Sequence, residues 1–174
     1  LLNVLISIFL ISTSVSAEII KNIDVEGNKR VSKDTIINFS ELKVGESYSE
    51  DVLNDALKEL YNSNFFEKVN LNFDSGKILI SVKELPIIQE IIINGIKAEK
   101  HIKDIKENMF LKEKSPFNKD IVINDVDKML NIFKSSGYYF VIIDSKIENN
   151  SNDTVNLIFD IDRGEKATIK KINF

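Results

Sequence analysis

Few residues of this 174-residue chain combine a reactive side chain with a partner at a useful spacing. The single histidine, His101, lies three residues before Asp104 on a predicted helix, where imidazole and carboxylate could bind a metal or act as a base. Either role needs further ligands or partners close by, and the sequence shows none. We therefore expect His101 to be an exposed helical residue.

Paired carboxylates are the other candidates, because two acids in one pocket can divide the acid and base roles. Glu50 with Asp51 and Asp125 with Asp127 are such pairs, but they lie near predicted helix caps or on polar helix faces. The chain has no cysteine and hence no disulfide, zinc site or thiol nucleophile, and its six glycines form no nucleotide-binding fingerprint. We predict no catalytic residue, no metal, no cofactor and no enzymatic activity.

The composition is that of an ordinary globular protein. Hydrophobic residues make up 43% and charged residues 29% of the chain, and its net charge of -4 is spread over positions of mixed sign. A nucleic-acid surface would need clustered lysine and arginine, so no nucleic-acid partner is expected.

Residues 1–17 have the pattern of a secretory signal peptide. An apolar run to about Ile11 is followed by a small polar segment ending in Ala17, which predicts cleavage between Ala17 and Glu18. A membrane anchor is the alternative, but the run is shorter than the ~20 residues that span a bilayer. Since an initiator Met and a charged leading segment are missing, we expect this signal peptide to be truncated. The protein is predicted to be exported.

An internal repeat organises the rest of the chain. The pattern of Ile20, Ile23, Val25 and Gly27 recurs at the same spacing from Ile88 to Gly95, and "TIKKINF" begins it a third time at Thr168. The apolar residues alternate as in a strand with one buried face, and the glycine supplies the positive φ of a turn.

Two helices are predicted after each first strand. Ser32 caps a short helix carrying Ile36, Ile37 and Phe39, and its counterpart carries Ile102, Ile105 and Met109. Ser49 and Asn118 cap the second helices, whose apolar stripes are expected at Leu53, Leu57 and Leu60 and at Val126, Leu130 and Phe133.

Both second helices are expected to end alike. Asn64 and Gly137 occupy the same place, and these two residue types most readily adopt the left-handed conformation that closes a helix. The aromatic pairs that follow, Phe65-Phe66 and Tyr138-Tyr139, are expected to pack in the core, with a client-binding pocket as the alternative.

Two strands complete each unit. Residues 68–74 and 77–84 alternate strictly around the turn at Asp74-Ser75-Gly76, with Ile78, Ile80 and Val82 predicted to point inward. Residues 139–147 and 154–162 do the same around the polar loop "ENNSND". The predicted class is α+β, with tandem β-α-α-β-β repeats, each a three-stranded mixed sheet covered by two helices.

This order of elements resembles the polypeptide-transport-associated (POTRA) domain. The resemblance is carried by "GN" after the first strand, "LYNSNFF" at the end of the second helix and "VKELPII" at the joint between repeats, and it extends from Glu18 to the end. Asn64 departs from the glycine usual at that helix end, and Leu85 replaces a usual charged residue.

The resemblance implies a periplasmic arm of an outer-membrane protein assembly factor in a Gram-negative bacterium. It implies a domain at 18–85, a second at 86–165, and the start of a third at 166–174. We call the first two the first and second unit. In the family such an arm continues through further repeats into a membrane barrel. The junction residues Leu85 and Pro86 are predicted to form a stiff hinge, because proline fixes φ.

The family's partners are unfolded outer-membrane proteins and accessory lipoproteins. Strand addition to an exposed sheet edge could receive such clients, because backbone pairing ignores the guest's side chains. By resemblance the second strand of each unit lies at that edge. The predicted contact residues are Lys68, Val69, Asn70, Leu71, Asn72 and Phe73 in the first unit, and Val141, Ile142, Ile143, Asp144 and Ser145 in the second.

Three other functions are consistent with the same repeats. Related translocation and assembly modules, and two-partner secretion transporters, also place such repeats before a barrel. An exported protein without a barrel could use tandem repeats as a binding scaffold.

Overall fold

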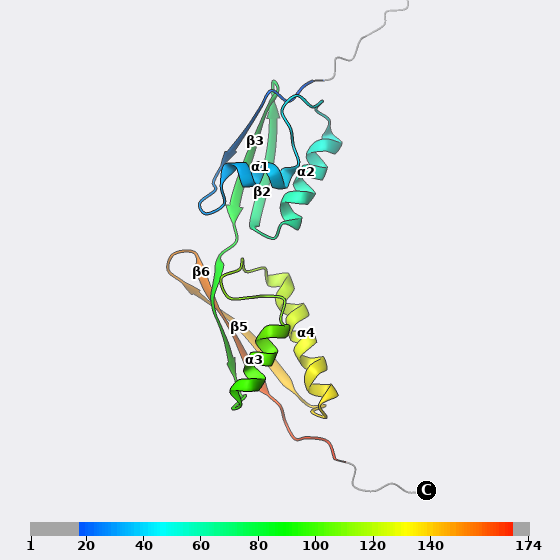
Figure 1. The fold of residues 1–174 in the computed structure, drawn as a ribbon, viewed down its shortest axis with the longest axis vertical. Coiled ribbons are helices and arrows are strands. Elements are labelled where there is room, and N and C mark those ends of the chain that lie inside the picture. Colours follow the sequence, from blue (N-terminus) through cyan, green and yellow to red (C-terminus); the bar gives the residue numbers. More distant parts are fainter. Residues whose placement is uncertain (1–17, 169–174) are drawn as a thin grey trace, which may run out of the picture.

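The computed structural model describes residues 18–168. The predicted signal peptide, with Ala17, and all but the first three residues of the expected third repeat lie outside the described residues. Two units of similar architecture follow each other along the long axis of the molecule, joined at one short connection (Figure 1). No helix within residues 18–168 is long and apolar enough to cross a membrane.

The first unit contains β1 (Asn22–Glu26), α1 (Lys33–Ser40), α2 (Glu50–Asn62), β2 (Phe66–Asp74) and β3 (Lys77–Glu84). Its sheet has the order β1-β3-β2, with β1 parallel and β2 antiparallel to the central β3. The second unit repeats this with β4 (Ile87–Asn94), α3 (Glu99–Asn108), α4 (Lys119–Ser135), β5 (Ile142–Asn150) and β6 (Thr154–Asp162), in the order β4-β6-β5. The predicted mixed sheets of tandem β-α-α-β-β units are confirmed.

Both helices of each unit lie on one face of its sheet (Figure 1), and the core fills the space between. The inward residues predicted on β3, Ile78, Ile80 and Val82, are all buried. Their counterparts on β6, Leu157 and Phe159, are fully buried. Each unit has its own core, so each sheet needs its own pair of helices.

The helix caps form as their residue types predict. Ser32 and Ser49 accept hydrogen bonds from the backbone of Thr35 and Val52, and Asn118 accepts one from Asp120. Asn64 and Gly137 have φ of 58° and 92°, the left-handed conformation expected at both helix ends.

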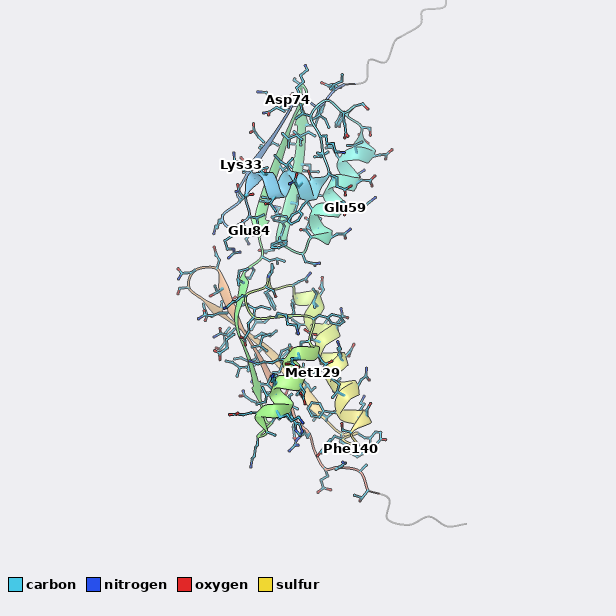
Figure 2. All side chains as sticks on the ribbon, in the orientation of Figure 1. Lys33, Glu59, Asp74, Glu84, Met129 and Phe140 are labelled. Carbon is cyan, nitrogen blue, oxygen red and sulfur yellow. The ribbon has the colours of Figure 1, made fainter. Side chains whose placement is uncertain are left out.

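The buried face of α4 differs from the predicted stripe. Phe133 is buried, but Val126 and Leu130 border the core, and Val122, Asp125 and Met129 point into it. Met129, labelled in Figure 2, is a buried residue of α4. The placement of Asp125 near a cap or on a polar face was wrong, since its side chain is fully buried. The burial is possible because two backbone N–H groups donate to the carboxylate.

The two aromatic pairs do not behave alike. Phe66 is buried and Phe65 stacks on Phe39, as expected for core residues. Tyr138 also packs inward, edge-on against Phe133, but Tyr139 is 62% exposed, so its predicted core position was wrong. A turn at 139–140 adds one residue relative to the first unit, counted between matching positions at the helix end and in the edge strand. Val141 follows the turn, directly before the edge strand, and is buried.

The last strand pair of the second unit is longer than predicted at its hairpin end. β5 begins at Ile142 and continues to Asn150, where Asn149 and Asn150 pair with Val155 and Thr154. Only residues 151–153 remain as a loop. The polar stretch "ENNSND" was predicted to be a loop, but its first three residues belong to β5. Their backbone groups pair with β6, and this pairing does not require apolar side chains.

Candidate functional site

The described residues contain no arrangement typical of a catalytic centre. His101 is exposed, and no group of His, Asp and Glu within residues 18–168 could hold a metal ion. An open groove of about 580 Å³ lies beside α3, lined by Ile91, Ile102 and surface charges such as Lys106 and Glu113. The sheet edges are a second kind of feature that could bind a partner.

One edge of each sheet is already partly covered. Beside β1, Ile20 donates to the carbonyl of Glu46 at 2.9 Å and accepts from Gly45 at 2.8 Å. Within β4, Ile88 is bonded in the same way to Ser115 and Lys114. In both units the loop before the second helix thus adds itself to this edge. The other edges are β2 and β5, the strands predicted to receive a client.

The structure places the predicted contact residues of the first unit within β2. Lys68, Asn70 and Asn72 are exposed on the outer face, Leu71 and Phe73 are half-buried, and Val69 is buried. In the second unit Ile142–Ser145 begin β5, but Val141 precedes the strand and is buried, so it is not an edge residue. The edge also continues to Asn150, beyond the predicted range.

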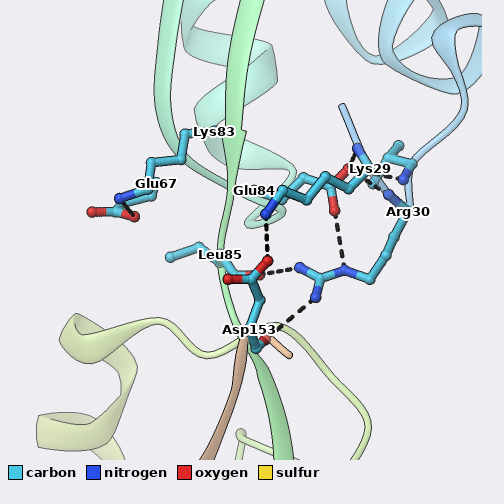
Figure 3. Close-up of polar contacts among 8 residues, drawn as sticks. Lys29, Arg30, Glu67, Lys83, Glu84, Leu85 and Asp153 are labelled. Carbon is cyan, nitrogen blue, oxygen red and sulfur yellow. Dashed lines mark hydrogen bonds and ion pairs between the residues drawn. The ribbon is translucent and has the colours of Figure 1, made fainter. Parts of the chain in front are cut away.

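A clasp of charged residues ties β3 to the turn after β1 (Figure 3). One carboxylate oxygen of Glu84 accepts from three successive backbone N–H groups, those of Lys29, Arg30 and Val31, at 2.7, 2.9 and 3.0 Å. The other oxygen accepts from Nε of Arg30 at 3.0 Å, and the Glu84 side chain is only 3% exposed. Three amides converging on one oxygen form an anion-binding nest.

The same clasp spans the junction between the units. Arg30 donates to the carbonyl of Leu85 at 2.6 Å, and Lys29 forms an ion pair with Asp153 in the β5–β6 loop. The backbone of Pro86 accepts from Phe117 at 2.8 Å. Leu85 and Pro86 are the two residues between β3 and β4, and the N–H of Leu85 donates to the carbonyl of Phe65 at 2.8 Å. Their role as a stiff hinge stays a prediction.

Asn64 adds a second contact between the units. Its side-chain oxygen accepts from Asn118, the cap residue of α4, at 2.9 Å. Glycine, the residue expected here from the resemblance, could not make this bond. The departure from the family pattern thus coincides with a contact across the junction.

Sequence reasoning did not identify the clasp, because its residues are far apart in the chain. Glu84 and Arg30 are 54 positions apart, and Lys29 and Asp153 are 124 apart. The available signal was an acidic residue at the end of β3, directly before the proline linker.

The clasp predicts a pH dependence of stability. Burial of the carboxylate raises the pKa of Glu84, but the three backbone N–H groups and Arg30 outweigh it and hold this pKa below its ordinary value. A lowered folded-state pKa stabilises the fold above the unfolded-state pKa, and this contribution is lost as the pH falls through the folded-state value. We therefore expect Glu84→Gln to reduce stability at pH 7 and to weaken the loss of stability below about pH 4.3, the ordinary value for Glu.

Thermal unfolding between pH 2.5 and pH 7 measures both effects. Glu67→Gln is the matched control, because Glu67 forms an exposed surface pair with Lys83 (Figure 3) and such pairs contribute about 0–1 kcal/mol. Equal pH profiles for Glu84→Gln and the unaltered protein would contradict the role given to Glu84.

The fold and its edges define a tandem array of small modules, each with one covered and one uncovered sheet edge. The chain belongs to the POTRA family, described as "Surface antigen variable number repeat", whose model matches residues 18–85 and 86–164.

Two relatives carry the name outer membrane protein assembly factor BamA. The protein from Neisseria meningitidis serogroup B is 29% identical over 89% of this chain, and that from Nitratidesulfovibrio vulgaris is 23% identical over 90%. The chain spans 20% of the length of either relative.

Solved structures show the same fold at low sequence identity. The N-terminal domain of Omp85 from Thermosynechococcus elongatus matches with a TM-score of 0.57 and 15% identity, over 81% of this chain and 61% of that one. POTRA1-2 of the periplasmic domain of Omp85 from Anabaena matches with a TM-score of 0.52 and 12% identity, over 81% of this chain and 93% of that one.

Proposed function

We propose that this chain is part of the periplasmic arm of an outer-membrane protein assembly factor. It receives unfolded β-barrel clients by strand addition and carries accessory lipoproteins, while a barrel outside this sequence anchors the whole protein in the outer membrane. The tandem POTRA units and the likeness to two proteins named BamA support this role.

The observation that carries the proposal is the position of β2 and β5. Each is an edge strand on the side of its sheet that the unit's own loop leaves uncovered. A guest strand pairing there satisfies backbone groups on both chains, whatever its side chains are. This suits a receiver of many different β-rich clients.

The expected affinity is low. Four to six backbone hydrogen bonds contribute a net ~0.5–1.5 kcal/mol each, whereas association costs an estimated ~4–15 kcal/mol of entropy. One edge alone therefore holds a client weakly, and neighbouring edges increase the hold through effective concentration. Weak binding permits release of the client to the membrane.

Amide chemical shifts of the isotope-labelled chain test the proposal. An outer-membrane β-barrel protein kept unfolded in dilute urea is titrated in, with a folded all-helical protein in the same urea as control. We expect shifts in β2 or β5 with the unfolded barrel protein and much smaller ones with the control, whose backbone groups are already paired. Shifts confined to α1–α4 would show that clients do not bind by strand addition.

A further inference from the structure

The two uncovered edges differ in how much backbone they offer. In an antiparallel pair, residues alternate between pointing their N–H and C=O toward the partner strand and away from it. The carbonyl of Ile161 points at Gly95, beside β4, and Ile143 lies opposite Ile161. The N–H and C=O of Ile143 therefore point outward, and by alternation so do those of Ser145, Ile147 and Asn149.

The same geometry applies in the first unit. The carbonyl of Val82 points at Gly27, after β1, and Val69 lies opposite Val82 on β2. Val69, Leu71 and Phe73 thus direct their backbone groups outward. Leu71 lies opposite Ile80, as Ser145 lies opposite Phe159, so Leu71 and Ser145 occupy matching edge positions.

A tyrosine closes part of the first edge. The hydroxyl of Tyr61, on α2, accepts from the N–H of Val69 at 3.1 Å and lies 3.5 Å from its carbonyl. At the matching position of α4, counted from Asn64 and Gly137, the chain has Lys134, which is exposed. Among residues 18–168, no hydrogen bond of a side chain or loop reaches the outward groups of β5. Four outward residues are therefore open on β5 and two on β2.

The side chains beside β5 also suit an apolar guest. Tyr139, Phe140 and Ile142 are 62%, 78% and 59% exposed around the start of the strand, where β2 has Glu67 and Lys68. Figure 2 shows Phe140 at the end of the second unit remote from the first. Strands of membrane barrels alternate apolar and polar residues, so one side of such a guest can contact these side chains.

We propose that β5 is the receiving edge of this arm and that the Tyr61 hydroxyl keeps β2 closed, the occupant of β5 being an extended, alternately apolar segment of an unfolded barrel client. This inference rests on the proposed function. It specifies that clients bind at β5, and that the Tyr61 hydroxyl closes β2.

Matched proline substitutions test it. Proline removes one N–H and is tolerated on an edge strand where that N–H faces solvent. Ser145→Pro and Leu71→Pro each remove one outward donor, from β5 and β2. The probe is a ten-residue peptide of alternating leucine and threonine with lysine at each end. A version with proline at alternate positions, which cannot pair through its backbone, is the control peptide.

We expect the peptide to shift the amides of Ile143, Ser145, Ile147 and Asn149, and the control peptide to shift none. Ser145→Pro should weaken binding at least tenfold, and Leu71→Pro should change it less than twofold. Circular dichroism of both variants verifies that they are folded.

Tyr61→Phe supplies an independent measurement, because it keeps the ring and removes the hydroxyl. When the peptide is added to this variant, we expect amide shifts at Val69, Leu71 and Phe73 that the unaltered chain does not show. The affinity of the peptide for β5 should stay unchanged. Shifts at β2 in the unaltered chain, or equal losses in the two proline variants, would overturn the inference and leave strand addition intact. Absence of binding at both edges would overturn the inference and strand addition together.

Discussion

Replacing Gly95 by alanine is expected to lower the free energy of unfolding of the second unit by about 3 kcal/mol or more. Gly95 has φ of 85°, a left-handed conformation that costs an L-residue about 1–2 kcal/mol. An added Cβ would also lie less than 3.0 Å from the carbonyl oxygen and carbon of Ile161. These atoms belong to the central strand β6, so they cannot move aside as a flexible side chain would.

A comparison of Gly27 with Gly45 separates the cost of the left-handed conformation from the cost of the steric clash, within the first unit. Gly27 also has positive φ, and its added Cβ would meet the backbone of Val82. Gly45 has φ of 96° but nothing within 4 Å of the added Cβ. Gly45→Ala should therefore cost only the conformational term, about 1 kcal/mol, and Gly27→Ala clearly more.

Denaturant unfolding followed through the amide signals of each unit measures these differences separately. If Gly27→Ala and Gly45→Ala lowered the free energy of unfolding equally, the steric clash between the turn after β1 and the central strand β3 would contribute nothing to the loss.

Replacing Asp125 by alanine is expected to destabilise the second unit by about 3 kcal/mol, because two backbone donors, one of them buried, lose their acceptor at once. The carboxylate of Asp125 accepts from the backbone N–H of Phe110 at 2.6 Å and of Leu111 at 3.0 Å. It therefore fixes the chain that leaves α3 onto the side of α4. The corresponding position of α2 is Val52, so this polar anchor is specific to the second unit.

Asp127→Ala is the matched control, since Asp127 is exposed two residues further along α4. Its effect should stay within about 0.5 kcal/mol, as for most surface substitutions. Asp125→Asn should fall between the two, because an amide keeps one acceptor oxygen but turns a donor toward the backbone. Chemical denaturation of the three variants measures the series, and equal stability of Asp125→Ala and Asp127→Ala would contradict the anchoring role.

Much of the fold is encoded in short stretches of sequence. Ser32, Ser49 and Asn118 cap helices through bonds that reach two or three residues along the chain, and Asn64 and Gly137 close helices by their own backbone conformation. Alternating apolar residues on β3 determine which face it buries, and the repeat determines that the second unit has the same order of elements. These features depend on residues that are close together in the chain, so the amino-acid sequence by itself determined them.

The tertiary structure alone decided what each ambiguous side chain does. Asp125 is buried because distant amides meet it, and Tyr139 is exposed because one extra residue turns the chain before β5. Glu84 joins residues 54 positions away, and the Tyr61 hydroxyl reaches across to Val69. Such contacts depend on how helices and strands lie on one another in three dimensions. For this reason the two edges, alike in sequence pattern, differ in how much backbone they leave open.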